Sequence, residues 1–166
     1  MEILAAVSDS PFSTWIRESE SLFGYPMFIL LHTIGLAIVV GVSSVVALLM
    51  LSGAPRSVLA ATRGMFPVMW TGFGINAVSG LVLMAADAPT LAMNPVMWVK
   101  FGFIVAVVML MRSARRFAAA DTDVAGAAPS GRARKALAAA TLACWLGAIV
   151  TGRLTAYIGG PDFFVE

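Results

Sequence analysis

The stretch LLHTIGLAIVVG, residues 30–41, decides the fold class of this chain. It lies inside a longer apolar run, residues 26–51, which contains no acidic residue, lysine or arginine. A helix of about 20 apolar residues crosses a hydrocarbon core of roughly 30 Å, so the run is predicted to span a membrane. Pro26 suits the first helical turn, where a missing N–H costs nothing. His32, the one histidine of the chain, also lies in this stretch, and its presence among apolar residues requires an explanation.

The whole chain has the composition of a membrane protein. Of its 166 residues, 60% are hydrophobic and 12% are charged, and the mean hydropathy is +0.90. A soluble domain carries about 25% charged residues. The length suits a single domain, residues 1–166, and a net charge of +2 is too small to indicate nucleic-acid binding. Cys144 is the single cysteine, so an internal disulfide is excluded.

Three further apolar runs are long enough to cross a bilayer. They cover about residues 65–86, 95–111 and 136–158. Together with residues 26–51 they predict an all-α polytopic membrane protein, a four-transmembrane-helix bundle. Residues 112–135 are expected to form the loop between the third and fourth spans.

Basic residues gather in two of the connections between the spans. The first and third connections hold Arg56, Arg63, Arg112, Arg115, Arg116, Arg132, Arg134 and Lys135. The second connection, DAPTLAMNP, holds no basic residue. The positive-inside rule therefore places the first and third connections in the cytoplasm and both termini outside.

A short amphipathic helix is expected ahead of the first span, at about residues 10–23. Ser10 is a plausible N-cap with Pro11 behind it, and Phe12, Trp15 and Ile16 share one face. Arg17 and Glu18 point away from that face. Such a helix is predicted to lie on the outer membrane surface.

Three basic or potentially basic side chains are predicted to lie at one depth near the outer side. At about 1.5 Å rise per residue, His32 lies roughly 9 Å inside the first span, Lys100 roughly 7–8 Å inside the third, and Arg153 roughly 9 Å from the end of the fourth. The four spans contain no acidic residue. These cations would have to be neutralised by an anionic ligand or by an acidic residue, for which the candidates are Glu18, Glu20, Asp87 and Asp162. Alternatively, Lys100 and Arg153 reach to the outer headgroups.

His32 cannot reach far toward the headgroups, and Gly35 leaves a flat recess beside its ring. Such a recess allows the close approach of a neighbouring backbone or of a planar ligand. A haem needs an imidazole for its iron, a glycine gap for the macrocycle and cations for its two propionates. The sequence therefore predicts a haem b site formed by His32, Gly35, Lys100 and Arg153. The alternative is a histidine that donates a hydrogen bond to a helix carbonyl.

The identity of the second axial ligand is left open, because the chain offers one histidine. The candidates are a methionine and His32 of another copy across a two-fold axis. Without either of them, the iron would be five-coordinate. Copper is the competing metal: Met27, Met93 and Met97, with Met84, fall on the outer side, and thioether sulfur with imidazole suits Cu(I).

The remaining motifs favour structural roles. Gly72, Asn76 and Gly80 recur every four residues on the second span and form a small-residue helix contact, across which Asn76 is expected to bond. The sequence shows no Ser/His/Asp constellation and no carboxylate pair typical of hydrolysis. Whether the chain is an enzyme stays open.

The segments WIRESESLFGYPMFILLHTIGLAIVVG, NPVMWVKFGF and WLGAIVTGRLTAYIG resemble a family of small four-helix bacterial inner-membrane proteins of unknown function. In arrangement the chain is also distantly similar to CopD-like and cytochrome b-like membrane proteins. That resemblance implies haem or copper handling at the outer side, with His32 at the matching histidine position. The chain lacks the further histidines of those proteins. The resemblance also implies a bacterial inner membrane. Because the positive-inside rule places both termini outside, they are then expected in the periplasm.

The leading interpretation is a haem-b-binding integral membrane protein that takes part in electron transfer at the periplasmic side. The alternatives are a small-anion transporter or binding protein, a structural or accessory subunit of a membrane complex, and a copper-handling protein. The cofactor is then haem b, copper or none. The expected partners are the lipid bilayer and a second copy, as a dimer sharing haem, or a larger membrane complex.

Overall fold

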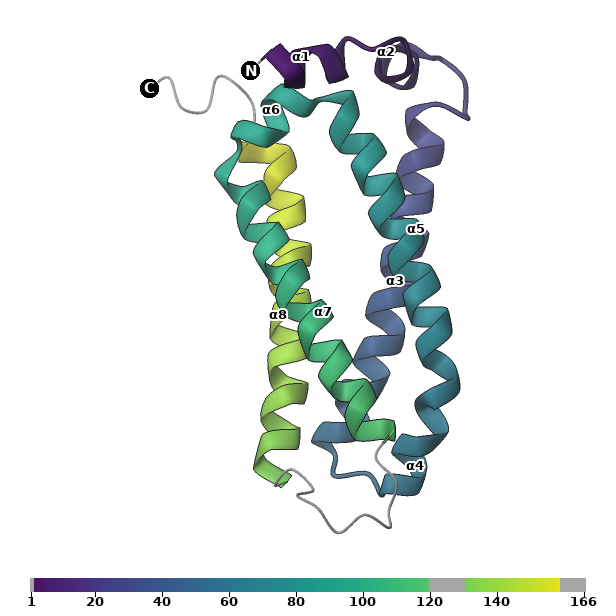
Figure 1. Cartoon of the computed structure of the whole chain (residues 1–166), viewed down its shortest axis with the longest axis vertical. Helices are drawn as coiled ribbons and strands as arrows, with labels where there is room; N and C mark the ends of the chain where they lie inside the picture. The colour runs from purple at the N-terminus through teal and green to yellow at the C-terminus, as the bar shows by residue number, and fades with distance from the viewer. Residues whose placement is uncertain (1, 120–130, 159–166) are drawn as a thin grey trace.

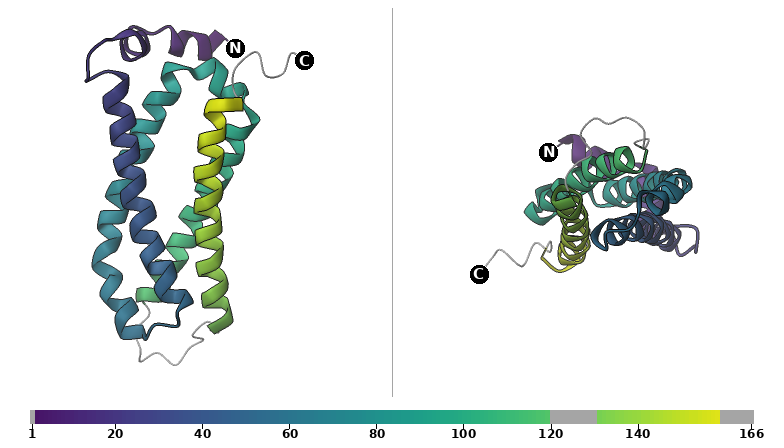
Figure 2. Two further views of the ribbon diagram at one scale, coloured as in Figure 1. Left: turned by 180° about the vertical axis from the view of Figure 1, so that it is seen from behind. Right: turned by 90° about the horizontal axis from the view of Figure 1, so that it is seen from below.

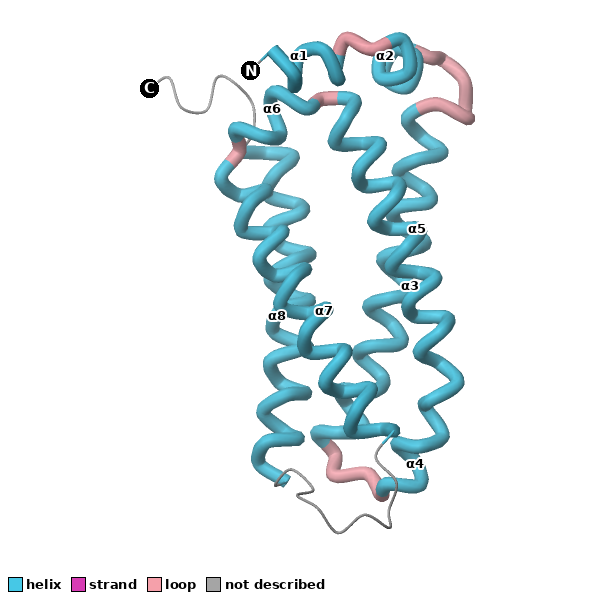
Figure 3. The backbone as a smooth tube through the Cα atoms, in the orientation of Figure 1, coloured by secondary structure: helices cyan, strands magenta, loops and turns pink. Residues whose placement is uncertain are grey.

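The computed structural model describes residues 2–119 and 131–158, and these residues are almost entirely helical (Figure 1). The elements in chain order are α1 (Glu2–Ser8), α2 (Pro11–Glu18), α3 (Tyr25–Leu51), α4 (Arg56–Ala61), the 3₁₀ turn η1 (Thr62–Gly64), α5 (Met65–Ala86), α6 (Ala88–Met93), α7 (Pro95–Ala119) and α8 (Gly131–Ile158). Short loops join most of the described helices (Figure 3). Four of the helices, α3, α5, α7 and α8, are long and apolar enough to cross a membrane. The predicted all-α four-helix architecture is confirmed.

The ends of the third and fourth long helices differ from the prediction. Residues 112–119 continue α7 and residues 131–135 begin α8, so both ends of the predicted loop at 112–135 are helical. The added residues are rich in arginine and alanine, which are strong helix formers. The apolar run that hydropathy detects ends at the first charged residues, whereas the helix continues through them. Residues 120–130 lie outside the described part of the chain.

The predicted surface helix is present but shorter than expected. It begins at Pro11, and Ser10 caps it by accepting a hydrogen bond from the Ser13 backbone N–H at 3.3 Å. It ends at Glu18 rather than near residue 23, because Ser19 is extended. The short helices α1, α4 and α6 were not predicted from the sequence. In Figure 1, α1, α2 and α6 lie across one end of the bundle, here called the surface-helix end.

The long helices pack as two pairs. α3 packs along α5, α7 packs along α8, and α8 also packs against α3 (Figure 2). α5 and α7 do not pack along each other. Two glycines bring the first pair together: a Cβ on Gly35 would lie 2.6 Å from the Asn76 backbone nitrogen, and one on Gly72 would lie 2.5 Å from Ile38 Cγ2. This close approach is what small residues permit at membrane helix contacts.

The apolar core occupies the half of the bundle away from the surface helices. Its buried members are Val39, Val46, Ala47, Met50, Leu59, Phe66, Met69, Val107, Met111, Ala114, Ala138, Trp145 and Ala148. The arginines of α4, of the end of α7 and of the start of α8 gather at the same end of the molecule, here called the basic end. Arg134 ties α8 to this end by donating to the Ala54 carbonyl at 3.1 Å. The other half of the bundle contains a cavity.

Candidate functional site

A pocket of about 700 Å³ lies at the surface-helix end, between the two helix pairs. Its walls come from α2, α3, α5, α6, α7 and α8 and include Arg17, His32, Met84, Asp87, Met97 and Lys100. A smaller pocket of about 190 Å³ shares His32, Met84, Met97 and Lys100 with it. The smaller pocket adds apolar walls from α5 and α7, among them Phe73, Leu81, Phe101 and Ile104. His32 and Lys100 therefore lie where the two pockets adjoin.

His32 is fixed by a reciprocal pair of hydrogen bonds between α3 and α5. Its Nδ1 lies 2.9 Å from the Asn76 carbonyl oxygen, and the Asn76 side-chain amide donates to the His32 carbonyl at 2.8 Å. Because a carbonyl only accepts, Nδ1 carries the proton and donates it. In the neutral ring, Nε2 then keeps its lone pair, and it has no hydrogen bond within the described chain. Asn76 thus bonds across the helix contact, as the sequence predicts.

Gly80 makes room for the imidazole. A Cβ at Gly80 would lie 2.9 Å from His32 Cε1 and 3.1 Å from Nδ1. The sequence pattern placed Gly80 in a stripe of helix–helix contacts, but the structure places it against a side chain. The positions of Gly80, Asn76 and His32 are therefore interdependent.

Lys100 comes from the second turn of α7 and reaches the same pocket. Gly152 of α8 lines its path, since a Cβ there would lie 3.5 Å from Lys100 Cε. The Lys100 side chain is partly buried. Within residues 2–119 and 131–158, its ammonium has neither a hydrogen bond nor an ion pair. An ammonium with no partner in the described part of the chain, beside an imidazole, makes this pocket suited to an anion.

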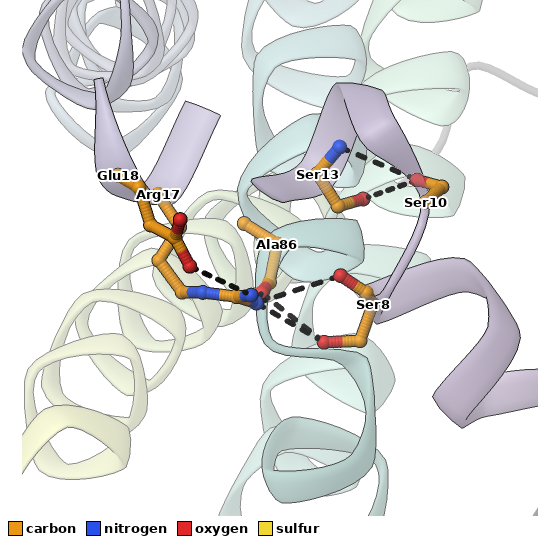
Figure 4. Close-up of polar contacts among 6 residues, drawn as sticks. All are labelled: Ser8, Ser10, Ser13, Arg17, Glu18 and Ala86. Carbon is orange, nitrogen blue, oxygen red and sulfur yellow. Dashed lines mark hydrogen bonds and ion pairs between the residues drawn. The ribbon is translucent and has the colours of Figure 1, made fainter. Parts of the chain in front are cut away.

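Three of the four acidic residues predicted as neutralising groups lie in the described part of the chain, and none of the three pairs with Lys100. Glu18 lies 3.6 Å from an Arg17 guanidinium nitrogen instead (Figure 4), and Glu20 is exposed. Asp87 lines the pocket but forms no ion pair with Lys100. Asp162 lies outside the described residues. The counter-charge for Lys100 therefore does not come from the described acidic side chains.

Arg17 is a pocket residue that the sequence analysis missed. Its Nη1 donates to the Ala86 carbonyl at 2.9 Å and to the Ser8 side chain at 3.3 Å, so it fastens α1 and α2 onto the end of α5 (Figure 4). A cation is favourable at the carboxyl end of a helix, where carbonyls lack helical partners. The sequence feature that could have indicated its role is its position, because Arg17 is the one basic residue ahead of the first span.

Arg153 does not join the predicted layer of cations. Its side chain is exposed on α8 and lines neither of the two pockets, although the adjacent Gly152 lines the larger one. Depth along a helix does not specify direction around it, and this is where the three-residue prediction was wrong. The structure brings together His32 and Lys100, with Arg17 on the pocket rim.

The recess beside Gly35 is filled by protein. The Gly72 carbonyl oxygen and the Asn76 backbone of α5 lie within 3 Å of where a Cβ of Gly35 would be. Of the two occupants that the sequence left open, the structure shows a neighbouring backbone rather than space for a planar ligand. Gly35 therefore supports the site by placing α5 against His32, and it does not line either pocket.

The methionines proposed for copper are dispersed. Met97 is buried and lines both pockets, whereas Met93 is 67% exposed at the end of α6 and Met27 lines neither pocket. Met84, on α5, lines both pockets with Met97 and His32. The methionines that share both pockets with His32 are therefore Met84 and Met97. No cluster of three or more histidine, cysteine or acidic side chains suited to a metal ion occurs within the described residues.

The roles of these residues rest on the contacts within this chain. His32 and Lys100 meet at the pocket, Gly35, Asn76 and Gly80 position the imidazole, and Arg17 closes the rim. The similarity to CopD-like and cytochrome b-like proteins remains an expectation from the sequence motifs. In comparisons with protein-family models, curated proteins and solved structures, nothing matches this chain.

Proposed function

We propose that this chain is a haem-b-binding membrane protein that takes part in electron transfer at its surface-helix end. The observation that carries the proposal is the state of the His32 ring. Nδ1 donates to the Asn76 carbonyl, which leaves Nε2 as the free ligand nitrogen in a pocket that also contains Lys100. Histidines that bind metals almost always donate their other ring N–H to a carbonyl, a carboxylate or water.

The rest of the pocket fits the chemistry of a porphyrin. Among the described residues, the Lys100 ammonium has neither a hydrogen bond nor an ion pair, and it would compensate a propionate. The adjoining smaller pocket, of about 190 Å³, adds the apolar side chains of Phe73, Phe101 and Ile104, which suit the edge of a macrocycle. A volume of about 700 Å³ lies within the range of roughly 300–1,000 Å³ typical of small-molecule and cofactor pockets.

Two thioethers are available for a second axial bond. Met84 and Met97 line the same pocket as His32, and histidine with methionine is a known pair of haem ligands. When bound, haem supplies one-electron chemistry; the residues of this chain would hold the iron, compensate the propionate charge and exclude water. The alternative of a shared haem between two copies requires no methionine ligand.

The distribution of arginines supports a periplasmic location for the site. The basic end would lie in the cytoplasm of a bacterial inner membrane by the positive-inside rule. The surface-helix end, with the pocket and both termini, would then face the periplasm. The electron-transfer partner would dock on that side.

An absorption spectrum of the full chain tests the proposal. The protein is produced with ample haem and purified in detergent. We expect a Soret band that is lost in His32→Ala and retained in Met93→Ala, which changes an exposed methionine outside both pockets. The proposal fails if the wild type has no Soret band, or if His32→Ala retains it at full occupancy.

The Lys100 ammonium, which has no ion pair within residues 2–119 and 131–158, favours a second candidate function, the binding of a small anion at the same pocket. A ligand that binds the folded state raises its thermal stability by mass action. The probes are acetate and inorganic phosphate, and the expected stabilisation disappears in Lys100→Gln but persists in Arg153→Gln. Equal stabilisation of all three proteins would contradict it.

A further inference from the structure

A second concave site lies at the basic end, far from the pocket around His32. It is a hollow of about 520 Å³ between α5 and α7, lined by Trp70, Arg112, Arg115 and Arg116. The three arginines follow one another within two turns of α7. A set of like charges is costly to hold together unless an anion compensates them.

The tryptophan wall of this hollow is held in place by side-chain contacts. The Arg112 guanidinium lies 5.9 Å from the centre of the Trp70 ring, within the range of a cation–π contact. Trp70 also meets Phe73 edge-on with ring centres 5.7 Å apart, and Phe73 packs on the apolar core. Side-chain contacts to Arg112 and Phe73 therefore define the position of the Trp70 ring in this hollow.

The three guanidinium groups make the hollow suited to an anion with several oxygen atoms. Arg112, Arg115 and Arg116 form no ion pair with any carboxylate in the described part of the chain. Guanidinium groups match phosphate oxygens bidentately, with charge-assisted hydrogen bonds. A phosphate group is therefore the ligand chemistry that fits best.

The surface next to the arginines indicates where that phosphate comes from. One face of α7 carries four residues at helical spacing, namely Val105, Met109, Arg112 and Arg116. Val105 is 59% exposed and Met109 is 65% exposed, so an apolar track leads up the helix to the guanidinium groups. A phospholipid has the same order, with acyl chains below its phosphate, whereas free phosphate gains nothing from the track.

We infer that this hollow binds the phosphate of an anionic phospholipid, with an acyl chain along Val105 and Met109. Basic pockets between membrane helices are suited to anionic headgroups, and tryptophan favours the membrane interface. Trp70 and the arginines would thereby anchor the ends of α5 and α7 to one lipid. The inference is independent of what the pocket around His32 binds.

Lipid binding to the full purified chain tests the inference. Native mass spectrometry in neutral detergent gives the apparent affinity for phosphatidylglycerol and for phosphatidylcholine, and thermal unfolding is followed with each lipid and with inorganic phosphate. We expect tight binding of phosphatidylglycerol alone. Each arginine near a charged lipid surface is worth about a fivefold change in affinity, so Arg112→Gln with Arg116→Gln should weaken binding by roughly 25-fold.

A second double variant separates this site from general charge attraction. Arg56→Gln with Arg132→Gln removes the same charge from the same end, at exposed residues that do not line the hollow. We expect its phosphatidylglycerol affinity to match the wild type. The inference is overturned if both double variants weaken binding equally, if phosphatidylcholine binds as tightly, or if inorganic phosphate stabilises the protein as well as the lipid.

Discussion

The orientation of His32 depends on two residues of the neighbouring helix. The Asn76 carbonyl accepts the Nδ1 proton, and Gly80 leaves the space in which the ring lies. A backbone carbonyl remains in place when the side chain is changed. The glycine is therefore the more sensitive of the two positions, because any added carbon meets the ring directly.

Gly80→Ala should displace the imidazole from its position. The new Cβ would lie 2.9 Å from His32 Cε1, a distance that forces the ring to move and strains its bond to Asn76. Overpacking of this kind costs about 1–3 kcal/mol. We expect a lower unfolding midpoint together with a shifted or weakened Soret band.

Gly74→Ala is the matched control on the same helix. A Cβ at Gly74 meets nothing within 4 Å, so both the spectrum and the unfolding midpoint should stay close to those of the wild type. If Gly80→Ala behaves like Gly74→Ala in both measurements, Gly80 does not position His32.

The sequence predicts the depth of the site residues but not the direction in which they point. Depth follows from the helical rise, and His32 and Lys100 do meet at one level. Arg153 has a comparable depth, yet it is exposed, because direction depends on which face of α8 packs inward. Arg17 is part of the rim through bonds to Ser8 and Ala86, which no local sequence pattern specifies.

At the scale of elements, the contact between α3 and α5 depends on backbone proximity. Gly35 faces backbone atoms of Gly72 and Asn76, and these cannot rotate away as a side chain can. The same contact carries the paired bonds of His32 and Asn76. Separating the two helices would therefore disturb the site as well as the fold.

Gly35→Ala should destabilise the protein by about 1–3 kcal/mol, since a Cβ there would lie 2.6 Å from the Asn76 nitrogen. Unfolding in mixed micelles measures the change. Gly41→Ala, on the same helix but with nothing within 4 Å of its Cβ, should have little effect. Comparable losses in the two variants would show that the close contact is unimportant.

Arg17 holds the surface helices to the end of α5, and its loss should release them. Charge-assisted hydrogen bonds are worth about 1.5–3 kcal/mol, so Arg17→Ala should speed amide exchange in α1 and α2 by about tenfold or more. Exchange in the core of α3, α5, α7 and α8 should not change.

Glu18→Ala tests whether the ion pair with Arg17 matters. Exposed ion pairs contribute little, about 0–1 kcal/mol, and the 3.6 Å contact is exposed. We expect exchange in α1 and α2 to stay near the wild-type rates. A Glu18→Ala effect as large as that of Arg17→Ala would assign the fastening to the ion pair.

The long helices were predictable because apolar length is a strong signal, whereas the short helices were not. α1, α4 and α6 have six or seven residues each, too few for a recognisable period. The end of α7 was missed because Arg112, Arg115 and Arg116 interrupt the hydropathy without interrupting the helix. Charge marks the limit of the apolar run rather than the limit of the backbone hydrogen bonding.

The whole molecule has two unlike halves. The basic end contains the apolar core and the Arg134 bond to Ala54. The surface-helix end contains the pocket with His32 and Lys100, covered by α1, α2 and α6. The apolar core and the pocket around His32 therefore lie at different levels of one bundle.

Labelling single cysteines tests the orientation that the arginines predict. In a Cys144→Ser background, Ser10→Cys should react with an impermeant maleimide in intact cells, because it lies at the surface-helix end. Arg132→Cys, at the basic end, should react only after the membrane is opened. The reverse pattern would mean that the surface-helix end faces the cytoplasm.

The smaller pocket is lined almost entirely by residues of α5 and α7, and its walls are mainly apolar. A ligand that entered between these two helices would come from the hydrocarbon layer by lateral diffusion and would reach Lys100 without passing through water. Its supply would then follow its partition coefficient, and the strongest competitors would be the most lipophilic acids rather than the most soluble ones.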